Sequence, residues 1–166
     1  MGLDLRAGDD LHVHLTAGGI HGHRRLCMLA FLATEDAPRE EFDAVHAWLT
    51  DQPSRAKAID MLKDPDHLET APDTDDAPAG INYDAMPEAY PVERRVLFRG
   101  LWHWVNHSDS DGEHDAAAVA EVAYSLTRLG STVRQVGGAR EHSEWLYRVA
   151  DFYVQARDAG LPVEFA

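Results

Sequence analysis

The sequence predicts a mainly α (α+β) protein, a single-domain helical bundle of about six helices with a small N-terminal β-hairpin. Two observations predict this fold class. Apolar residues recur at helical spacing through most of the chain, whereas strict alternation of apolar and polar residues is confined to the N-terminus. In addition, 166 residues with 45% hydrophobic content fit one domain with a sizeable core. Along residues 1–166 we expect a hairpin (1–16), helices (20–63), a loop rich in proline and acids (64–91), helices (92–159) and a tail (160–166).

The hairpin prediction depends on two alternating segments, residues 3–6 and 11–16, with turn-forming residues 7–10 between them. Successive side chains of a strand point to opposite faces of the sheet. One face of the second strand is therefore expected in the core, and the other is expected outside. The expected inner residues are Leu11, Val13 and Leu15, and the expected outer residues are His12, His14 and Thr16.

Three helices are predicted between residues 20 and 63. The first, residues 20–34, is so apolar that burial on most sides is expected, and it carries the single cysteine, Cys27, as a small core residue. The second follows Pro38 and extends to Leu49. Pro53 is expected to open a short third helix.

The segment 64–91 contains five of the eight prolines and is predicted to be a long irregular connection. Three more helices are predicted after it, with the middle one running from His114 to Leu129 and stopping at Gly130. The tail is expected to form a short extended piece that pairs with the N-terminal strands.

The net charge of −14, from 29 acidic and 15 basic residues, repels phosphate backbones and anionic lipid surfaces. We therefore expect no nucleic-acid partner and no membrane insertion, and no apolar run approaches the ~20 residues of a transmembrane helix. A single cysteine excludes an internal disulfide and a zinc site of the CxxC type. A cytoplasmic location is the expectation.

The segment His107-Ser108-Asp109-Ser110-Asp111-Gly112-Glu113-His114 is the most informative part of the chain. Alternating carboxylates on a turn can supply oxygens to a hard cation such as Ca²⁺. Imidazole together with carboxylate would instead suit Zn²⁺ or Mn²⁺. The candidate ligands of this central loop are His107, Asp109, Asp111, Glu113, His114 and Asp115, with Glu121 able to reach in from the next helix.

Two other interpretations of the central loop stay open. Carboxylates before the first turn of a helix stabilise that helix through its dipole and by capping, by about 0.3–1 kcal/mol each. The loop could equally be a docking surface for a partner. The EF-hand pattern does not fit, because when Gly112 takes its sixth position the twelfth position is Ala118 rather than glutamate.

The N-terminal histidines form a second candidate group. His12 and His14 share one strand face, and His21 and His23 follow in what is expected to be a glycine-rich turn. Three or four imidazoles there could bind a transition metal such as Zn²⁺. Exposed surface histidines are the alternative. Farther along, Trp102 and Trp104 flank His103, and we expect one indole in the core and the other in a cleft or interface.

The start Met1-Gly2-Leu3-Asp4-Leu5, the string from Val105 to Glu113 and the end Gly160-Leu161-Pro162-Val163-Glu164-Phe165 resemble a group of uncharacterised bacterial, largely actinobacterial, proteins with a mid-chain His-Ser-Asp-x-Asp-Gly-Glu motif. Ser110 stands where those proteins often have cysteine, and the group implies no activity. The helix–Asp-Gly-Glu–helix order with Glu121 is also similar to the helical tellurite-resistance TerB-like modules. That likeness implies an acidic, metal-linked interaction domain.

These patterns favour a small acidic helical protein that acts through binding and carries no chemistry of its own. Its expected partner is a protein, homo-oligomerisation is compatible with the sequence, and a divalent cation (Ca²⁺, Mn²⁺ or Zn²⁺) is the ligand under the metal interpretation. The alternative is a metal-dependent hydrolase-like enzyme that combines the N-terminal histidines with the carboxylates of the central loop. That alternative requires the two groups to converge in space.

Overall fold

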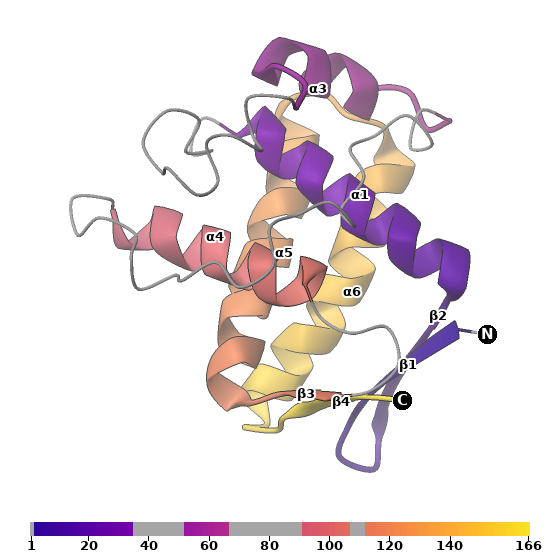
Figure 1. The fold of residues 1–166 in the computed structure, drawn as a ribbon, viewed down its shortest axis with the longest axis vertical. Helices are drawn as coiled ribbons and strands as arrows, with labels where there is room; N and C mark the ends of the chain where they lie inside the picture. The colour runs from indigo at the N-terminus through magenta and orange to yellow at the C-terminus, as the bar shows by residue number, and fades with distance from the viewer. Residues whose placement is uncertain (1, 35–51, 67–90, 107–111) are drawn as a thin grey trace.

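The computed structural model describes residues 2–34, 52–66, 91–106 and 112–166. The described part is mainly helical, and a four-stranded antiparallel sheet lies at one end of the helices (Figure 1). Its helices are α1 (Ala17–Ala33), α3 (Arg55–Leu62), α4 (Val92–Val105), α5 (Ala116–Gln135) and α6 (Arg140–Asp158). Its strands are β1 (Gly2–Ala7), β2 (Leu11–Thr16), β3 (Gly112–His114) and β4 (Val163–Phe165).

The fold class and the N-terminal hairpin are confirmed, but six helices in a bundle are not. The described residues form five helices, and the helix expected after Pro38 lies outside them. The short helix expected after Pro53 is present as α3, with the Ser54 side chain accepting a hydrogen bond from the Lys57 backbone N–H as N-cap. The predicted loop 64–91 is outside the described residues except at its two ends.

The sheet is larger than the sequence predicted. Its strand order is β2-β1-β4-β3, with every neighbouring pair antiparallel. The expected pairing of the tail with the N-terminal strands is confirmed, because β4 pairs with β1. The third strand, β3, was not predicted. Three residues of the central loop extend beside β4 there, so the helix expected to begin at His114 begins at Ala116 instead.

The inner face of the sheet contributes to one hydrophobic core with the helices. On β1, Leu3 and Leu5 are fully buried. On β2 only Leu15 is buried, whereas Leu11 and Val13 are partly buried against the core. The difference follows from position, since β1 lies inside the sheet and β2 lies at its edge.

Three further expectations for the helices are wrong. The first helix begins at Ala17, with Thr16 as N-cap, so His21 and His23 lie on α1 and not in a turn. The fifth helix continues past Gly130 to Gln135. Gly130 lies within α5 and not at its end. It lies against the ring of Tyr147 on α6, and a β-carbon at this position would come within 3.1 Å of that ring. Both Trp102 and Trp104 are fully buried, so the expected exposed indole is absent from α4.

The crossing of α4 over α5 depends on another close approach. A β-carbon on Gly100 would lie 2.1 Å from both the Glu121 carbonyl oxygen and the Ser125 Oγ. Ser125 donates to the Leu97 carbonyl at 2.8 Å across the same crossing. The backbone of α4 therefore contacts α5 directly at this point.

We expect Gly100→Ala to lower the free energy of unfolding by about 3 kcal/mol, since overpacking here would push backbone against backbone. Gly18→Ala is the matched control, because a β-carbon there meets nothing within 4 Å and alanine favours helix by about 0.5–1 kcal/mol. Urea unfolding of both variants measures the difference. Equal stability of the two variants would contradict the close crossing.

Candidate functional site

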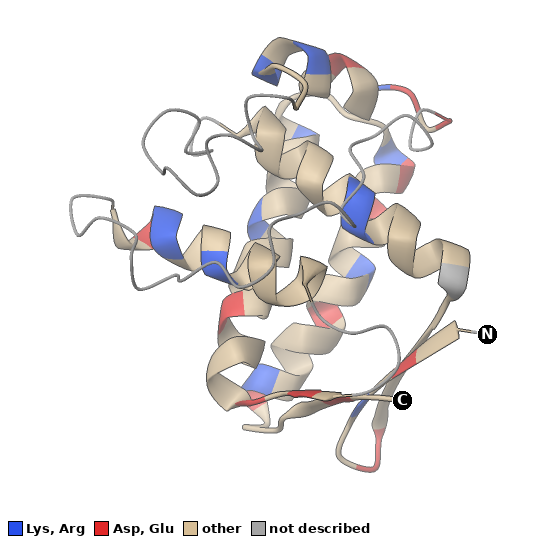
Figure 2. Ribbon diagram, viewed as in Figure 1, with Lys and Arg blue, Asp and Glu red and all other residues tan. Residues whose placement is uncertain are grey.

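The outer face of the sheet gathers exposed charged and titratable side chains from all four strands. Cross-strand partners place them in one row, because Arg6 is opposite His12 on one side and Glu164 on the other, and Glu164 is opposite Glu113. All four are exposed. Figure 2 shows acidic residues on both β3 and β4. We call this row, together with Asp4 and His14, the outer sheet face.

The histidine end of the outer sheet face is organised around Asp4. One oxygen of its carboxylate, Oδ1, lies 2.6 Å from His14 Nδ1 and 3.1 Å from His12 Nε2. The other oxygen lies 3.5 Å from the Arg6 guanidinium. The hydrogen bonds from His14 and His12 hold the pKa of Asp4 below its usual value. The prediction that His12, His14 and Thr16 face outward together is confirmed.

Asp4 was not recognised as a site residue, although a signal was present. In a hairpin with the observed register, Asp4 is directly opposite His14 and shares its face. Alternation along residues 3–6 was sufficient to place it there. The same alternation along Val163, Glu164 and Phe165 puts Glu164 outside between two buried residues.

The described part of the central loop divides between the surface and the core. Glu113 is exposed, whereas His114 is buried on the opposite side of β3. His114 Nδ1 lies 3.1 Å from the Tyr153 hydroxyl, and Nε2 lies 3.1 Å from the His103 carbonyl oxygen. Its ring also meets Phe165 edge to face at 4.8 Å. His114 therefore acts as an anchor of β3 in the core.

Asp115 caps α5, as the capping interpretation expects, since its carboxylate accepts a hydrogen bond from the Ala118 backbone N–H at 2.8 Å. Glu121 pairs with α4, since Arg99 Nη2 lies 3.0 Å from its Oε1 and His103 Nε2 lies 3.2 Å from its Oε2. His107, Asp109 and Asp111 lie outside the described residues. Within the described residues, no three His, Cys, Asp or Glu side chains form a group that could hold a metal ion.

Of the residues that a hydrolase-like site would combine, the members within the described part of the chain do not converge. His12 and His14 are on β2, at one edge of the sheet, and Glu113 is on β3, at the other edge. Three strand spacings of about 4.8 Å separate those edges by about 14 Å. His23 does not join them, because it is buried inside the helical layer.

His23 belongs to a buried cluster between α1, α4 and α6. Its Nδ1 accepts a hydrogen bond from the Trp104 indole N–H at 3.1 Å, and the Cys27 sulfur lies 3.5 Å from the same nitrogen. Indole rings of Trp104 and Trp145 meet the imidazole edge to face, each at 5.3 Å. Buried Arg24 donates from Nε to the Trp104 carbonyl at 3.1 Å.

Burial keeps this cluster uncharged apart from Arg24. Removal from water lowers the pKa of His23 to about 3, and the Arg24 charge adds to that lowering. Burial likewise raises the pKa of Cys27 and that of Tyr153. Because the nucleophilic form of cysteine is the thiolate, His23 and Cys27 at neutral pH form a packed polar contact and not an activated pair. The expectation that Cys27 is a buried core residue is confirmed.

The lowered pKa of His23 predicts that acid destabilises the fold. Between pH 3 and 6.5 the imidazole of His23 binds a proton in the unfolded chain but not in the folded protein. The contribution of neutral His23 to the free energy of unfolding is therefore fully present above pH 6.5 and decreases as the pH falls toward 3. One such proton changes stability by up to about 1.4 kcal/mol per pH unit. His23→Gln should lower stability at pH 7 by about 1–3 kcal/mol and flatten the slope between pH 6.5 and 4.5.

Chemical denaturation at a series of pH values measures both effects of the His23 substitution. His21→Gln, on the exposed side of α1, is the control and should retain the wild-type slope. An unchanged slope in the His23 variant would mean that another group controls the acid response.

Comparisons with protein-family models, curated proteins and solved structures found no match to this chain. The resemblance to bacterial proteins with the His-Ser-Asp-x-Asp-Gly-Glu motif therefore stays a prediction, as does the likeness to TerB-like modules. No described helix has both the length and the apolar character that crossing a membrane requires. The function must accordingly be inferred from the arrangement of the residues themselves.

Proposed function

We propose that this protein is a binding module that recognises a protein partner through the outer sheet face and the adjoining central loop. The observation that carries this proposal is the pairing of Glu113 with Glu164. The two residues are directly opposite each other on β3 and β4, and both are exposed. Like charges directly opposite in a sheet destabilise it, so an opposite charge brought by a partner would relieve a cost.

The location of the pair supports recognition by the same end of the molecule as the central loop. Glu113 is the second residue after the segment 107–111, which contains Asp109 and Asp111 in the sequence. The acidic margin of the sheet therefore favours a partner with a basic surface. At the other end of the outer sheet face, the side chains of His12, His14 and Arg6 surround the carboxylate of Asp4.

The core contacts beneath the outer sheet face also favour a binding role. The inward residues of β1 and β4 are buried, and His114 anchors β3 to Tyr153 of α6. A face held in this way loses little conformational entropy on association. Trp102 and Trp104 contribute nothing to this surface, since both are in the core.

Neutralising the acidic pair should stabilise the isolated protein and weaken partner binding. Glu113→Gln with Glu164→Gln removes the repulsion, for which we expect a gain of about 0.2–1 kcal/mol in urea unfolding. A photo-crosslinking amino acid placed at position 12 should form a covalent adduct with the partner in cells. The same double variant should lose that adduct. The charge-matched control, Glu141→Gln with Asp151→Asn on exposed α6 positions, should keep the adduct.

A photoreactive residue at Gln155, on an exposed position of α6, provides the positional control and should give no adduct. Equal adducts from positions 12 and 155 would contradict recognition by the outer sheet face. So would an adduct that persists after both glutamates are neutralised.

The proposal also includes a divalent cation bound by the central loop. Protein purified without a histidine tag should then contain Ca²⁺, Mn²⁺ or Zn²⁺ by elemental analysis. At about 100 times its Kd the bound cation should add about 2.7 kcal/mol of stability, which chelator removes. Asp109→Asn with Asp111→Asn should abolish this gain.

The control for the metal measurement is Asp9→Asn with Asp10→Asn, in the turn between β1 and β2, which makes the same change in charge. That variant should retain the full cation response. Absence of a response to any of the three cations in the wild-type protein would remove the metal from the proposal.

A further inference from the structure

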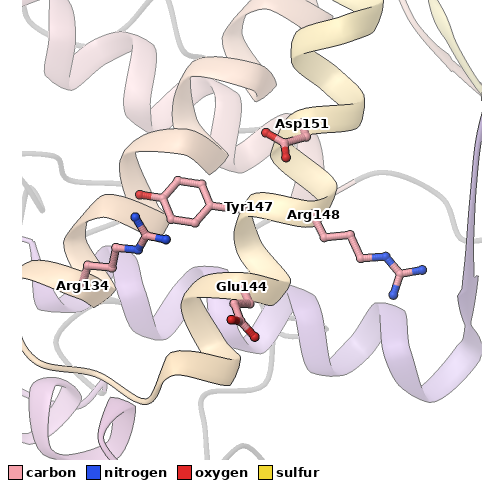
Figure 3. A pocket seen from close by; sticks show the side chains of 5 residues that line it. All are labelled: Arg134, Glu144, Tyr147, Arg148 and Asp151. Atoms are coloured by element: carbon pink, nitrogen blue, oxygen red, sulfur yellow. The ribbon is translucent and has the colours of Figure 1, made fainter.

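The described surface includes a charged depression on α5 and α6 and an open sheet edge at β2. The depression is lined by Arg134, Glu144, Tyr147, Arg148 and Asp151 (Figure 3). Its two arginines and two acids balance, and Arg134 lies over the Tyr147 ring at 4.6 Å. The depression therefore prefers neither anions nor cations, whereas the edge of β2 presents a row of backbone groups.

β2 is an edge strand without the features that usually prevent edge strands from pairing. It is the outermost strand in the order β2-β1-β4-β3, and among the described residues no strand pairs with its outer side. Its six residues, Leu11–Thr16, include no proline and no Lys, Arg, Asp or Glu. The other edge strand, β3, is three residues long and carries Glu113. Because a long uncharged edge readily accepts another strand, β2 is the edge at which this sheet can grow.

The backbone groups that point out of the sheet at β2 belong to His12 and His14. Asp4 exchanges two backbone hydrogen bonds with the last residue of the chain, at 2.9 and 3.0 Å, so its N–H and C=O point toward β4. The groups of the next residue, Leu5, therefore point toward β2, where Leu5 is opposite Val13. Because this direction alternates along a strand, the N–H and C=O groups of His12 and His14 point away from β1. They are the groups that an added strand would bind.

The inward side chains of β2 are incompletely covered. Leu11 and Val13 are only partly buried, whereas Leu3 and Leu5 on the neighbouring strand β1 are fully buried. A strand added at the open edge would remove more of their apolar area from water, which is favourable by about 25 cal/mol per Å². The edge therefore offers an added strand both backbone pairing and apolar burial.

The two ends of β2 have opposite electrostatic character. The turn before the strand contains Asp9 and Asp10, both exposed. The helix α1 begins directly after the strand, and its first turn contains no acidic residue to offset the positive end of the helix dipole. When two identical strands pair antiparallel, each acidic turn lies at the N-terminus of α1 in the other copy. β2 is therefore complementary to itself, which favours a second copy over an unrelated strand.

We propose that β2 pairs antiparallel with β2 of a second copy of this chain. Side chains and backbone groups both alternate with a period of two, so the pairing joins His12 and His14 to each other's backbone groups. The register that pairs the entire strand has its two-fold axis at Val13, with His12 opposite His14 and Leu11 opposite Leu15 of the second copy. Inward apolar residues then meet inward apolar residues, and the four-stranded sheet continues across both copies.

This dimer does not rest on recognition of a partner by the outer sheet face. Its two-fold axis is perpendicular to the sheet, so the outer sheet faces of both copies join into one surface, and the helices of both copies lie on the opposite side. A covalent adduct at position 12 with twice the mass of the chain would report the dimer, whereas any other mass would report the partner.

Light scattering of the full chain over a range of concentrations tests the pairing. The mass should rise from 18.4 kDa toward twice that value. His12→Pro removes an edge N–H from each copy and should weaken self-association about tenfold or more. Each copy should still fold, because this N–H does not pair with β1. His12→Gln is the matched control, since it removes the same imidazole but retains the N–H, and it should associate as the wild type does.

A cysteine at position 13 tests the register. The two Val13 positions face each other across the axis as a pair without direct hydrogen bonds, and the Cα atoms of such a pair are about 4.5 Å apart, within the range of a disulfide. Val13→Cys should therefore form a disulfide-linked dimer with a mild oxidant. Leu11→Cys is the control and should not, because Leu11 is opposite Leu15. The native Cys27 does not interfere, since it is fully buried.

Charge reversal tests the electrostatic complementarity of the two strand ends. Asp9→Lys with Asp10→Lys should weaken self-association about threefold or more at low salt, because each copy then brings positive charge to the N-terminus of α1 in the other. Glu141→Lys with Asp151→Lys, on exposed positions of α6, makes the same change in net charge. This control should associate at least as well as the wild type, since it reduces the repulsion between two acidic chains.

A mass that stays at 18.4 kDa at the highest soluble concentration would overturn the proposal. Equal association of the His12→Pro and His12→Gln variants would show that another surface joins the copies. A disulfide that forms through Leu11→Cys and not through Val13→Cys would exclude the register. Equal weakening by the two charge reversals would remove the turn and the helix N-terminus from the interface.

Discussion

The insertion of β4 between β1 and β3 is the constraint on which the rest of the structure depends. Through this one short strand, the C-terminus of the chain joins the N-terminal hairpin to the central loop. Backbone hydrogen bonds between Asp4 and Ala166, at 2.9 and 3.0 Å, continue the pairing to the end of the chain. A missing β4 would leave β1 and β3 with unpaired backbone groups, which are costly when they are shielded from water.

The same insertion decides which side chains share a surface. Because side chains alternate along each strand, one register fixes the inner and outer residues of all four strands together. Val163 and Phe165 go inward, where Phe165 meets His114, and Glu164 goes outward between Arg6 and Glu113. The outer sheet face is thus a product of pairing between segments that are more than 150 residues apart in sequence.

Buried imidazoles show how tertiary contacts change the meaning of a histidine. His23, His114 and His142 are all buried, and His142 Nδ1 lies 2.9 Å from the Leu62 carbonyl oxygen. His12 and His14 are exposed and surround a carboxylate. Within the described residues, a single residue type therefore serves as a core polar contact at some positions and as the partner of a surface carboxylate at others, and residue type alone does not distinguish these roles.

The sequence by itself determined the fold class, the hairpin, the inward and outward residues of β2, the burial of Cys27 and the extended tail, because local periodicity and turn residues specify each of these. It did not determine the end of α5, since whether Gly130 stops a helix or permits close packing depends on Tyr147 from another helix. Nor did it determine β3, because a three-residue strand exists only where a partner such as β4 satisfies its backbone. The tertiary structure alone decided that His114 enters the core while Glu113 meets Glu164, since a strand must send adjacent side chains to opposite faces.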